Sequence, residues 1–213
     1  MASLHLHCNA QWVQVCHRLN FIGEGRIMDI FKAIYERQSI GHVNPDRVPR
    51  ELIEKILATG VQAPNHYKVR PWQFIVLTGS ARERLGEIMA QSLHKRNPEA
   101  SDEALSKERH KPLRAPVLIA VGVHRPGLEK VLDIENVVAV SAAMQNMQLA
   151  AHALGLASMI RSGDPVTDPH VKDFLGLAHD QHLLGFLYIG YPIDEHKPVE
   201  RPAFEDRTTW LEE

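Results

Sequence analysis

Residues 134–154 form an apolar stretch with almost no polar side, and this feature limits the possible folds more than any other. An α-helix rises about 1.5 Å per residue, so a helix over this stretch would be about 31 Å long and would span a small domain. A helix that is apolar on most sides has to be covered by other parts of the protein. We therefore expect a long buried helix that also lies in the core of a dimer. Its apolar residues are Ile134, Val137, Val138, Val140, Ala142, Met144, Met147, Leu149, Ala151 and Leu154.

Shorter patterns predict the elements around this helix. Apolar residues at helical spacing indicate two further helices, and short apolar runs bounded by turn residues indicate buried strands. Strands that alternate with helices, without an internal repeat, predict one α+β domain built as a three-layer α/β/α sandwich. The expected helices are 28–37 and 50–60, and the expected strands are 72–77, 116–123, a short strand that ends near 160, and 183–189.

Three connecting segments carry their own signals. Residues 61–71 contain two prolines among polar residues and are expected to form a loop. Ser80 is followed three residues later by Glu83, a capping-box pattern that predicts a helix with Ser80 as its N-cap. The polar, charge-rich stretch 94–112 predicts a solvent-exposed helix or excursion.

Composition excludes several classes of protein. The 213 residues carry a formal net charge of -2, so a basic footprint for nucleic acid or an anionic membrane is absent. Both cysteines, Cys8 and Cys16, lie near the start, so no disulfide can hold the remaining chain together. No apolar run approaches the roughly 18–20 residues of a membrane span. We expect a cytoplasmic protein.

Residues 1–27 differ from the rest of the chain, because they contain both cysteines and little periodicity. We expect an N-terminal extension that is disordered or an artefact of the assigned start, with 28–213 as a single domain. Codons for Gly23-Glu24-Gly25 can form a purine-rich string that resembles a ribosome-binding site just before the codon of Met28. N-terminal sequencing of the native protein tests this expectation, and a chain that begins at Met1 or Ala2 refutes it.

A histidine-based metal site is an alternative that the sequence supports weakly. Zinc ligands normally come in pairs two to four residues apart, and three or four ligands are required. The candidates are His5, His7 and Cys8 with Cys16 and His17, and separately His179 with His182. The first group matches no standard spacing and the second lacks a third ligand, so we predict no metal site.

Four segments, in order along the chain, resemble the nitroreductase family and more closely its minimal bacterial branch, which lacks the usual large insertions. Each segment alone is only moderately specific, whereas four in the right order and spacing are strong support. The segments are Glu36–Ser39 (R-R-S in the family), Ala63–His66 with Arg70–Phe74 (A-P-x-H/S and Q-P-W-x-F), Met144–Gly155 (the long central helix), and Ile160–Gly163 with Phe186–Pro192 (the closing strand and G-x-P).

The resemblance implies a nitroreductase-like fold with a mixed central sheet and an obligate homodimer with two FMN sites at the subunit interface. It further implies that NADH or NADPH reduces the flavin in a ping-pong cycle. The acceptors of such enzymes are nitroaromatics, quinones or similar electron-poor compounds. Alternatives on the same fold are reductive dehalogenation, flavin fragmentation, or a flavin-binding sensor without turnover.

The resemblance also implies which residues bind FMN. Its dianionic phosphate needs cations and hydroxyl groups, which Arg37, Ser39 and Arg161 can supply through charge-assisted hydrogen bonds. Taken alone, Arg37 would be an ordinary cation at a helix end, and His66 a packed loop histidine. Asn65 and Arg70 are further candidates near the flavin ring. The full expected FMN set is Arg37, Gln38, Ser39, Ile160, Arg161 and Ser162, with Gln62 and His66 reaching the flavin of the partner subunit.

The end of the central helix is the expected nicotinamide nucleotide site, although its small residues also suit plain helix packing. The residues concerned are Ala150, Ala151, His152, Ala153, Leu154 and Gly155. Hydride transfer between nicotinamide and flavin needs orientation and electrostatic tuning rather than a protein nucleophile. We therefore predict no catalytic acid, base or nucleophile, in agreement with the absence of hydrolase, P-loop and C-x-x-C motifs.

Overall fold

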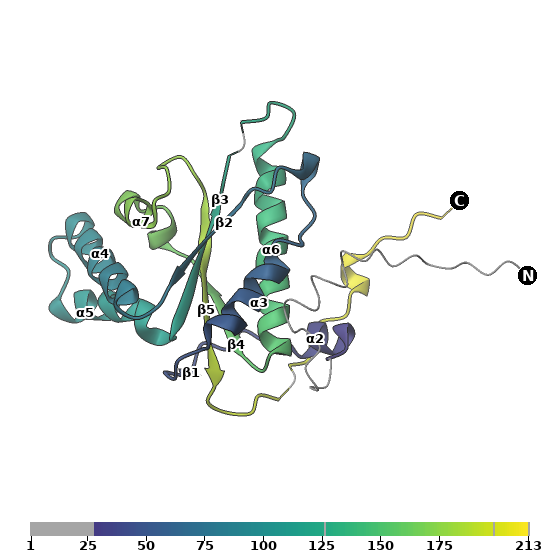
Figure 1. Ribbon diagram of the computed structural model, residues 1–213, viewed down its shortest axis with the longest axis horizontal. Helices are drawn as coiled ribbons and strands as arrows, with labels where there is room; N and C mark the ends of the chain where they lie inside the picture. Colours follow the sequence, from purple (N-terminus) through teal and green to yellow (C-terminus); the bar gives the residue numbers. More distant parts are fainter. Residues whose placement is uncertain (1–27, 126, 198, 213) are drawn as a thin grey trace, which may run out of the picture.

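A five-stranded sheet lies between two layers of helices in the computed structural model, which describes residues 28–125, 127–197 and 199–212 (Figure 1). On one side of the sheet lie α3 (Arg50–Gly60) and α6 (Asp133–Ala153). On the other side lie α4 (Ser80–Arg96), α5 (Asp102–His110) and α7 (Pro169–Leu175). The predicted three-layer α/β/α arrangement is confirmed.

The sheet is built around β5 (Leu183–Pro192), which pairs with three other strands. These are β1 (Val43–Asn44), β3 (Val117–Val123) and β4 (Ala157–Arg161). The remaining strand, β2 (Trp72–Leu77), pairs with β3 alone.

All strand pairs of the described residues are antiparallel, so the expected mixed sheet is wrong for the strands themselves. For β2 and β3, the register shows why the pair is antiparallel. Leu77 at the end of β2 lies opposite Leu118 at the start of β3, because α4 and α5 together return the chain to the edge that it left. The one parallel contact described is an isolated bridge between Ser39 and Ser158.

The long helix predicted from the apolar stretch is confirmed as α6, whereas its place in the core of a dimer stays a prediction. The side of α6 that faces the sheet is buried against β3 and β5, where Val140, Met144 and Met147 pack with Ile119 and Ile189. Burial of one such side chain contributes roughly 1.5–3 kcal/mol. The other side of α6 stays exposed, however.

Two local predictions are corrected by the structure. Residues 72–77 form an edge strand rather than a fully buried one, since β2 pairs with β3 alone among the described strands, and Val76 is exposed. The N-cap of α4 is Gly79, with φ of 53°, and Ser80 is the first helical residue, so its hydroxyl does not cap the helix. At α5, by contrast, Ser101 accepts a hydrogen bond from the N–H of Ala104.

The predicted exposed excursion at 94–112 contains the end of α4, the helix α5 and the 3-10 turn η2 (Lys111–Arg114). It packs more closely than expected. Glu108 is buried and forms an ion pair with Lys111, and Gly86 of α4 lies against the carbonyl group of Arg109.

The rest of the described chain consists of short elements. Residues 61–71 form a loop as predicted, with the 3-10 turn η1 (His66–Lys68) inside it. The others are α2 (Ile30–Glu36), η3 (Asp164–Val166) and η4 (Glu205–Arg207). The expected extension 1–27 lies outside the described residues. Within the described ranges, no helix combines the length and apolar character that a membrane crossing requires.

Candidate functional site

Arg37 lies at the C-terminal end of α2 and forms one part of the candidate site. Its Nη1 atom is buried and has no hydrogen-bond partner among the described residues. Nη2 of Arg201, from the segment after β5, donates to the backbone carbonyl oxygen of Arg37 over 3.4 Å. Burial, and then the positive charge of Arg201, lower the pKa of Arg37. Two cationic side chains thus act on each other, and neither has a carboxylate partner in the described part of the chain, an arrangement that suits an anion.

The chain after Arg37 runs beside β4 and reaches Arg161. Ser39 bridges to Ser158, and the N–H of Ile40 donates to the carbonyl oxygen of Ser158 over 3.0 Å. A Cβ atom on Gly41 would lie only 2.6 Å from Nη2 of Arg161, so this glycine allows the guanidinium to approach the backbone.

Arg161 resembles Arg37 in its surroundings. Its Nε atom is buried without a partner in the described part of the chain. Its guanidinium carbon lies 5.5 Å from the centre of the Tyr188 ring, within the range of a cation–π contact. Burial raises the pKa of Tyr188 to about 12, so the ring stays uncharged at neutral pH. Ile160 and Ser162, on either side of Arg161, are exposed.

Gln38 has a different environment from its neighbours. Its Nε2 donates to the backbone carbonyl oxygen of Lys197 over 2.6 Å. The side chain that stands in place of the family's second arginine therefore anchors the segment after β5, the same segment that carries Arg201.

The second part of the candidate site is the loop that contains Gln62 and His66. Gln62 is exposed, and its Nε2 lies 3.4 Å from the carbonyl oxygen of Ala58. His66 is half exposed, with Nδ1 at 3.7 Å from Oε1 of Glu135 at the start of α6. Beside it is an open hollow of about 440 Å³. The hollow is lined by Pro64, Asn65, His66, Ile134, Glu135, Val138 and Ala139.

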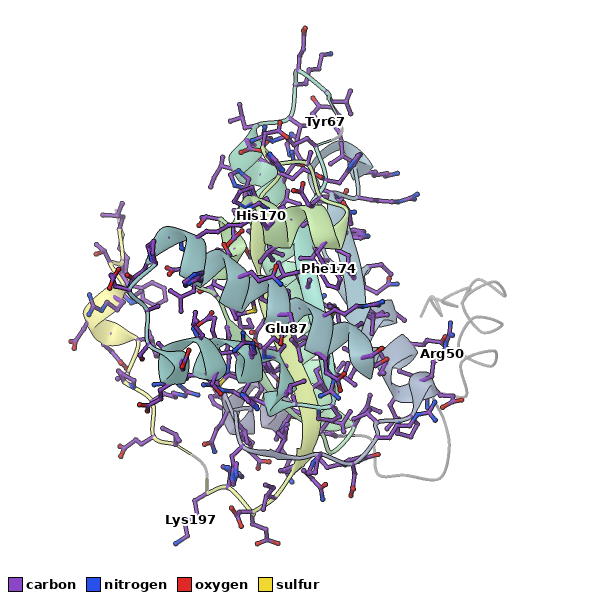
Figure 2. The ribbon with its side chains drawn as sticks, turned by 90° about the vertical axis from the view of Figure 1, so that its left-hand side faces the viewer. Arg50, Tyr67, Glu87, His170, Phe174 and Lys197 are labelled. Atoms are coloured by element: carbon purple, nitrogen blue, oxygen red, sulfur yellow. The ribbon has the colours of Figure 1, made fainter. Side chains whose placement is uncertain are left out.

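The two parts lie at opposite ends of the molecule. His66 contacts Glu135 at the start of α6, whereas Arg37 acts electrostatically on His152 in the last turn of the same helix. A helix rises roughly 1.5 Å per residue, so positions 135 and 152 of α6 are about 25 Å apart. Figure 2 shows the same separation, with Tyr67 at one end of the molecule and Lys197 at the other. The structure brings the segment after Arg37, with Ser39 and Gly41, beside the strand that carries Arg161, and does not bring His66 there.

The segment expected to bind the nicotinamide nucleotide closes α6. The side chain of Ala151 is fully buried and packs in the core, so it is not available to a ligand in the protomer. His152 is partly buried, and its Nε2 has no hydrogen-bond partner in the described residues. Burial lowers its pKa, Glu36 opposes this shift, and Arg37 and Lys32 add to it. Ala153 and Gly155 are exposed, and Ala150 and Leu154 are half buried.

The candidate metal ligands do not converge. His179 pairs with Asp173 at 2.7 Å, and His182 pairs with Asp133 at 2.6 Å. In the residues that the structure describes, no group of three or more metal-binding side chains is found. The cluster proposed around His5 and Cys16 lies outside those residues.

Arg201 is the residue of the site that the sequence did not reveal. It stands in a polar stretch without periodicity, and nothing in its local pattern distinguishes it from other exposed arginines. Only the path of the chain after β5 brings it to Arg37.

Curated proteins and a family model match most of this chain. The model of the nitroreductase family matches residues 34–191. The protein named "Putative NAD(P)H nitroreductase YdjA" of Escherichia coli (strain K12) is 32% identical over 165 residues, which are 78% of this chain and 89% of that protein. Iodotyrosine deiodinase 1 of Sus scrofa is 26% identical over 193 residues, which are 83% of this chain and 66% of that protein.

Solved structures agree with these matches. The nitroreductase-like family protein of Bacillus cereus superposes with a TM-score of 0.76 at 25% identity, over 89% of this chain and 100% of that chain. A Desulfovibrio desulfuricans protein described as a nitroreductase in complex with FMN superposes with a TM-score of 0.67 at 25% identity, over 87% and 97%. Together with the family model and the E. coli relative, they identify this chain as a member of the nitroreductase family.

Proposed function

We propose that this protein is an FMN-dependent oxidoreductase that takes hydride from NADH or NADPH and reduces nitroaromatics, quinones or similar electron-poor acceptors by a ping-pong mechanism. We further propose that it works as a cytoplasmic homodimer with FMN at the subunit interface. Its family and the FMN that the D. desulfuricans relative holds support the cofactor.

The observation that carries the proposal is the pair of guanidinium groups of Arg37 and Arg201. The charge of Arg201 acts on Arg37, and like charges that interact raise the energy of the protein unless an anion compensates them. Neither arginine has an ion pair with a carboxylate in the described residues, and Nη1 of Arg37 is buried without a partner. The phosphate of FMN supplies the missing charge and acceptor oxygens, so the residues present fit this group.

The residues around this pair have distinct roles in the proposed site. Arg37, Arg201 and the hydroxyl group of Ser39 would hold the phosphate, and Gln38 would keep the segment of Arg201 in place through its bond to Lys197. Arg161, positioned by Gly41 and Tyr188, would place its charge beside the flavin. Bound FMN supplies the redox chemistry, because its ring accepts hydride and passes electrons on. No residue of the site is required as a nucleophile.

Exposed apolar surface supports the homodimer. On α2, the side chains of Ile30, Phe31 and Ile34 are 49–64% exposed, and on α6, Ile134 and Val138 are 60–61% exposed. Exposed apolar side chains clustered on a helix are typical of an interface between subunits, and here they occur on α2 and at the start of α6. FMN is shorter than the roughly 25 Å between the two halves of the candidate site on α6. In a dimer, His66 and Gln62 of a second copy would lie beside Arg37 of the first copy. Each FMN site would then be built from residues of both subunits.

One absorption experiment tests the proposal. The purified protein is expected to show the bands of bound flavin, to lose them on anaerobic addition of NADH or NADPH, and to regain them with a nitroaromatic or a quinone. A colourless dimer that does not take up added FMN would refute it. Bound FMN that neither nicotinamide reduces would instead favour the sensor.

Reductive dehalogenation is the second candidate, and the similarity to iodotyrosine deiodinase 1 of Sus scrofa favours it. The flavin and its binding residues would be the same, so the two candidates differ only in the acceptor. Release of iodide from a halogenated phenol by the reduced protein, in the absence of activity on quinones, would favour this candidate.

A further inference from the structure

The loop from Asn65 to Arg70 has a strained backbone that presents charged side chains. Tyr67, Lys68 and Arg70 have φ angles of 47°, 55° and 51°, in the left-handed region that side chains other than glycine rarely adopt. Oδ1 of Asn65 accepts a hydrogen bond of 2.9 Å from the N–H of Arg70, which helps to hold this shape. Strain of this kind persists where surrounding structure maintains it and is concentrated at binding sites.

Lys68 and Arg70 are cations without partners. Both are exposed, and neither side chain forms an ion pair or hydrogen bond within the described ranges. Glu135, a carboxylate that contacts this loop, is already engaged, because it accepts from the N–H of Leu132 over 2.8 Å and lies 3.7 Å from His66. Within the described residues, two positive charges therefore remain without a partner on the loop whose residues Pro64, Asn65 and His66 line the hollow.

An aromatic side chain accompanies these cations. Tyr67 is 64% exposed and meets the His66 ring edge-on, with 4.7 Å between ring centres. Figure 2 shows Tyr67 at the far end of the molecule from Lys197. A planar ring next to free cations suits a ligand that has aromatic rings and phosphates.

The end of α6 is less suited to such a ligand. The cations at this end, Arg37 and Arg201, are already assigned to the FMN phosphate, and the C-terminal end of a helix carries partial negative charge, which disfavours a second anion there. The hollow at this end is lined by the carboxylates of Glu36, Asp194 and Glu195. The N–H groups of Leu154, Gly155 and Leu156 are bonded to helix carbonyls and are not free for a phosphate.

We propose that Lys68 and Arg70 bind the phosphates of the nicotinamide dinucleotide and thereby favour NADPH, whose 2′-phosphate adds negative charge, over NADH. The inference rests on the proposed function, since it places this loop at the flavin of the partner subunit. Lys68 and Arg70 act as specificity-determining residues, and Asn65 is a positioning residue for the loop.

The test compares the FMN-loaded dimer with Lys68→Gln, Arg70→Gln and the double variant. We expect each single change to raise the KM for NADPH about tenfold, the equivalent of about 1.4 kcal/mol, with little change in kcat. The effect on NADH should be smaller, so that the preference for NADPH disappears in the double variant. Lys107→Gln is the matched control, because Lys107 is an exposed cation on α5 without a partner among the described residues. It should leave both KM values unchanged.

A binding measurement separates this inference from overall activity. Isothermal titration calorimetry of the FMN-loaded dimer with NADP⁺ should give a Kd that rises with salt and that rises at least about tenfold in each variant. The inference is overturned if the double variant binds NADP⁺ with an affinity within about twofold of that of the unaltered protein. It is also overturned if, in the kinetic test, the variants lose kcat with NADPH and keep its KM. The proposed function survives either result if NADPH still reduces the flavin. Protein that binds no FMN overturns both.

Discussion

The side chain of Arg201 donates a hydrogen bond to the backbone carbonyl group of Arg37, from 164 residues further along the chain. The contact joins the guanidinium group of Arg201 to the backbone of Arg37, and the charge of Arg201 helps to lower the pKa of Arg37. Neither side chain has a carboxylate partner among the described residues. The contact also ties the chain after β5 to the end of α2, and Gln38 strengthens this tie through its bond to Lys197. The phosphate half of the proposed flavin site is therefore built from two distant segments.

Removal of either arginine should weaken FMN binding. A charge-assisted hydrogen bond contributes about 1.5–3 kcal/mol, so we expect Arg37→Gln or Arg201→Gln to raise the Kd of FMN by about 10- to 100-fold. Quenching of flavin fluorescence on titration of the apoprotein measures this Kd. Arg50→Gln is the control, because Arg50 lies on the surface of α3 in an ion pair with Glu54 (Figure 2). Equal Kd values for all three variants would contradict a phosphate site at this position.

Two glycine substitutions should separate binding from folding. In Gly86→Ala the new Cβ would lie 2.2 Å from the carbonyl oxygen of Arg109, a backbone atom that cannot easily move. We expect a loss of about 1–3 kcal/mol in the free energy of unfolding, as is typical of overpacking. In Gly41→Ala the new Cβ would meet Nη2 of Arg161 and Sδ of Met159, both at the ends of flexible side chains.

The effect of Gly41→Ala should therefore appear as weaker FMN binding, with a smaller change in stability than that of Gly86→Ala. Urea unfolding measures the stability and flavin titration the binding. A Gly86→Ala protein with normal stability, or a Gly41→Ala protein with normal FMN affinity, would show that the neighbouring groups adjust freely.

Asp168 should make the stability depend on pH in the acidic range. Burial opposes ionisation of this carboxylate, but hydrogen bonds from Ser92, from the N–H groups of His170 and Val171, and from Arg96 outweigh burial and lower its pKa. A carboxylate with a lowered pKa stabilises the fold fully above its unfolded value of 3.8 and loses this contribution as the pH falls through the folded pKa.

We expect Asp168→Asn to reduce the free energy of unfolding by about 1–3 kcal/mol at pH 7, because the charge-assisted bond to Arg96 is lost, although an asparagine can still cap α7. The difference from the unaltered protein should shrink as the pH falls below 3.8. Urea unfolding at a series of pH values gives both quantities. Asp102→Asn, at an exposed carboxylate in the first turn of α5, should show no such trend. A deficit that is the same at every pH would mean that ionisation of Asp168 is unimportant.

A charge on the exposed side of α6 should separate the proposed dimer. Val138 is 60% exposed in the protomer, and an unpaired carboxylate buried there by a second copy would cost several kcal/mol. We expect Val138→Asp to run as a monomer in size-exclusion chromatography with light scattering, and to bind FMN poorly. Leu113→Asp, at an exposed apolar residue of η2, should stay dimeric. A Val138→Asp dimer with normal FMN content would place the interface elsewhere.

The sequence alone determined the elements whose signal is local. The apolar stretch at 134–154 became α6, with ends at Asp133 and Ala153. The short apolar runs became β3 and β5, which are largely buried because each has a neighbour on both sides. Such patterns arise from the residues of one segment, so they can be recognised before the fold is known.

Only the tertiary structure decided which segments meet. The sequence could not show that β2 would be an edge strand, that the strand pairs would be antiparallel, or that Gly79 rather than Ser80 would cap α4. It marked Arg37, Arg161 and His66 through a resemblance, yet the structure placed His66 at the far end of α6 and brought Arg201 to Arg37. The physical reason is that contacts between distant residues depend on the path of the whole chain, whereas helix and strand patterns depend on neighbours a few positions apart.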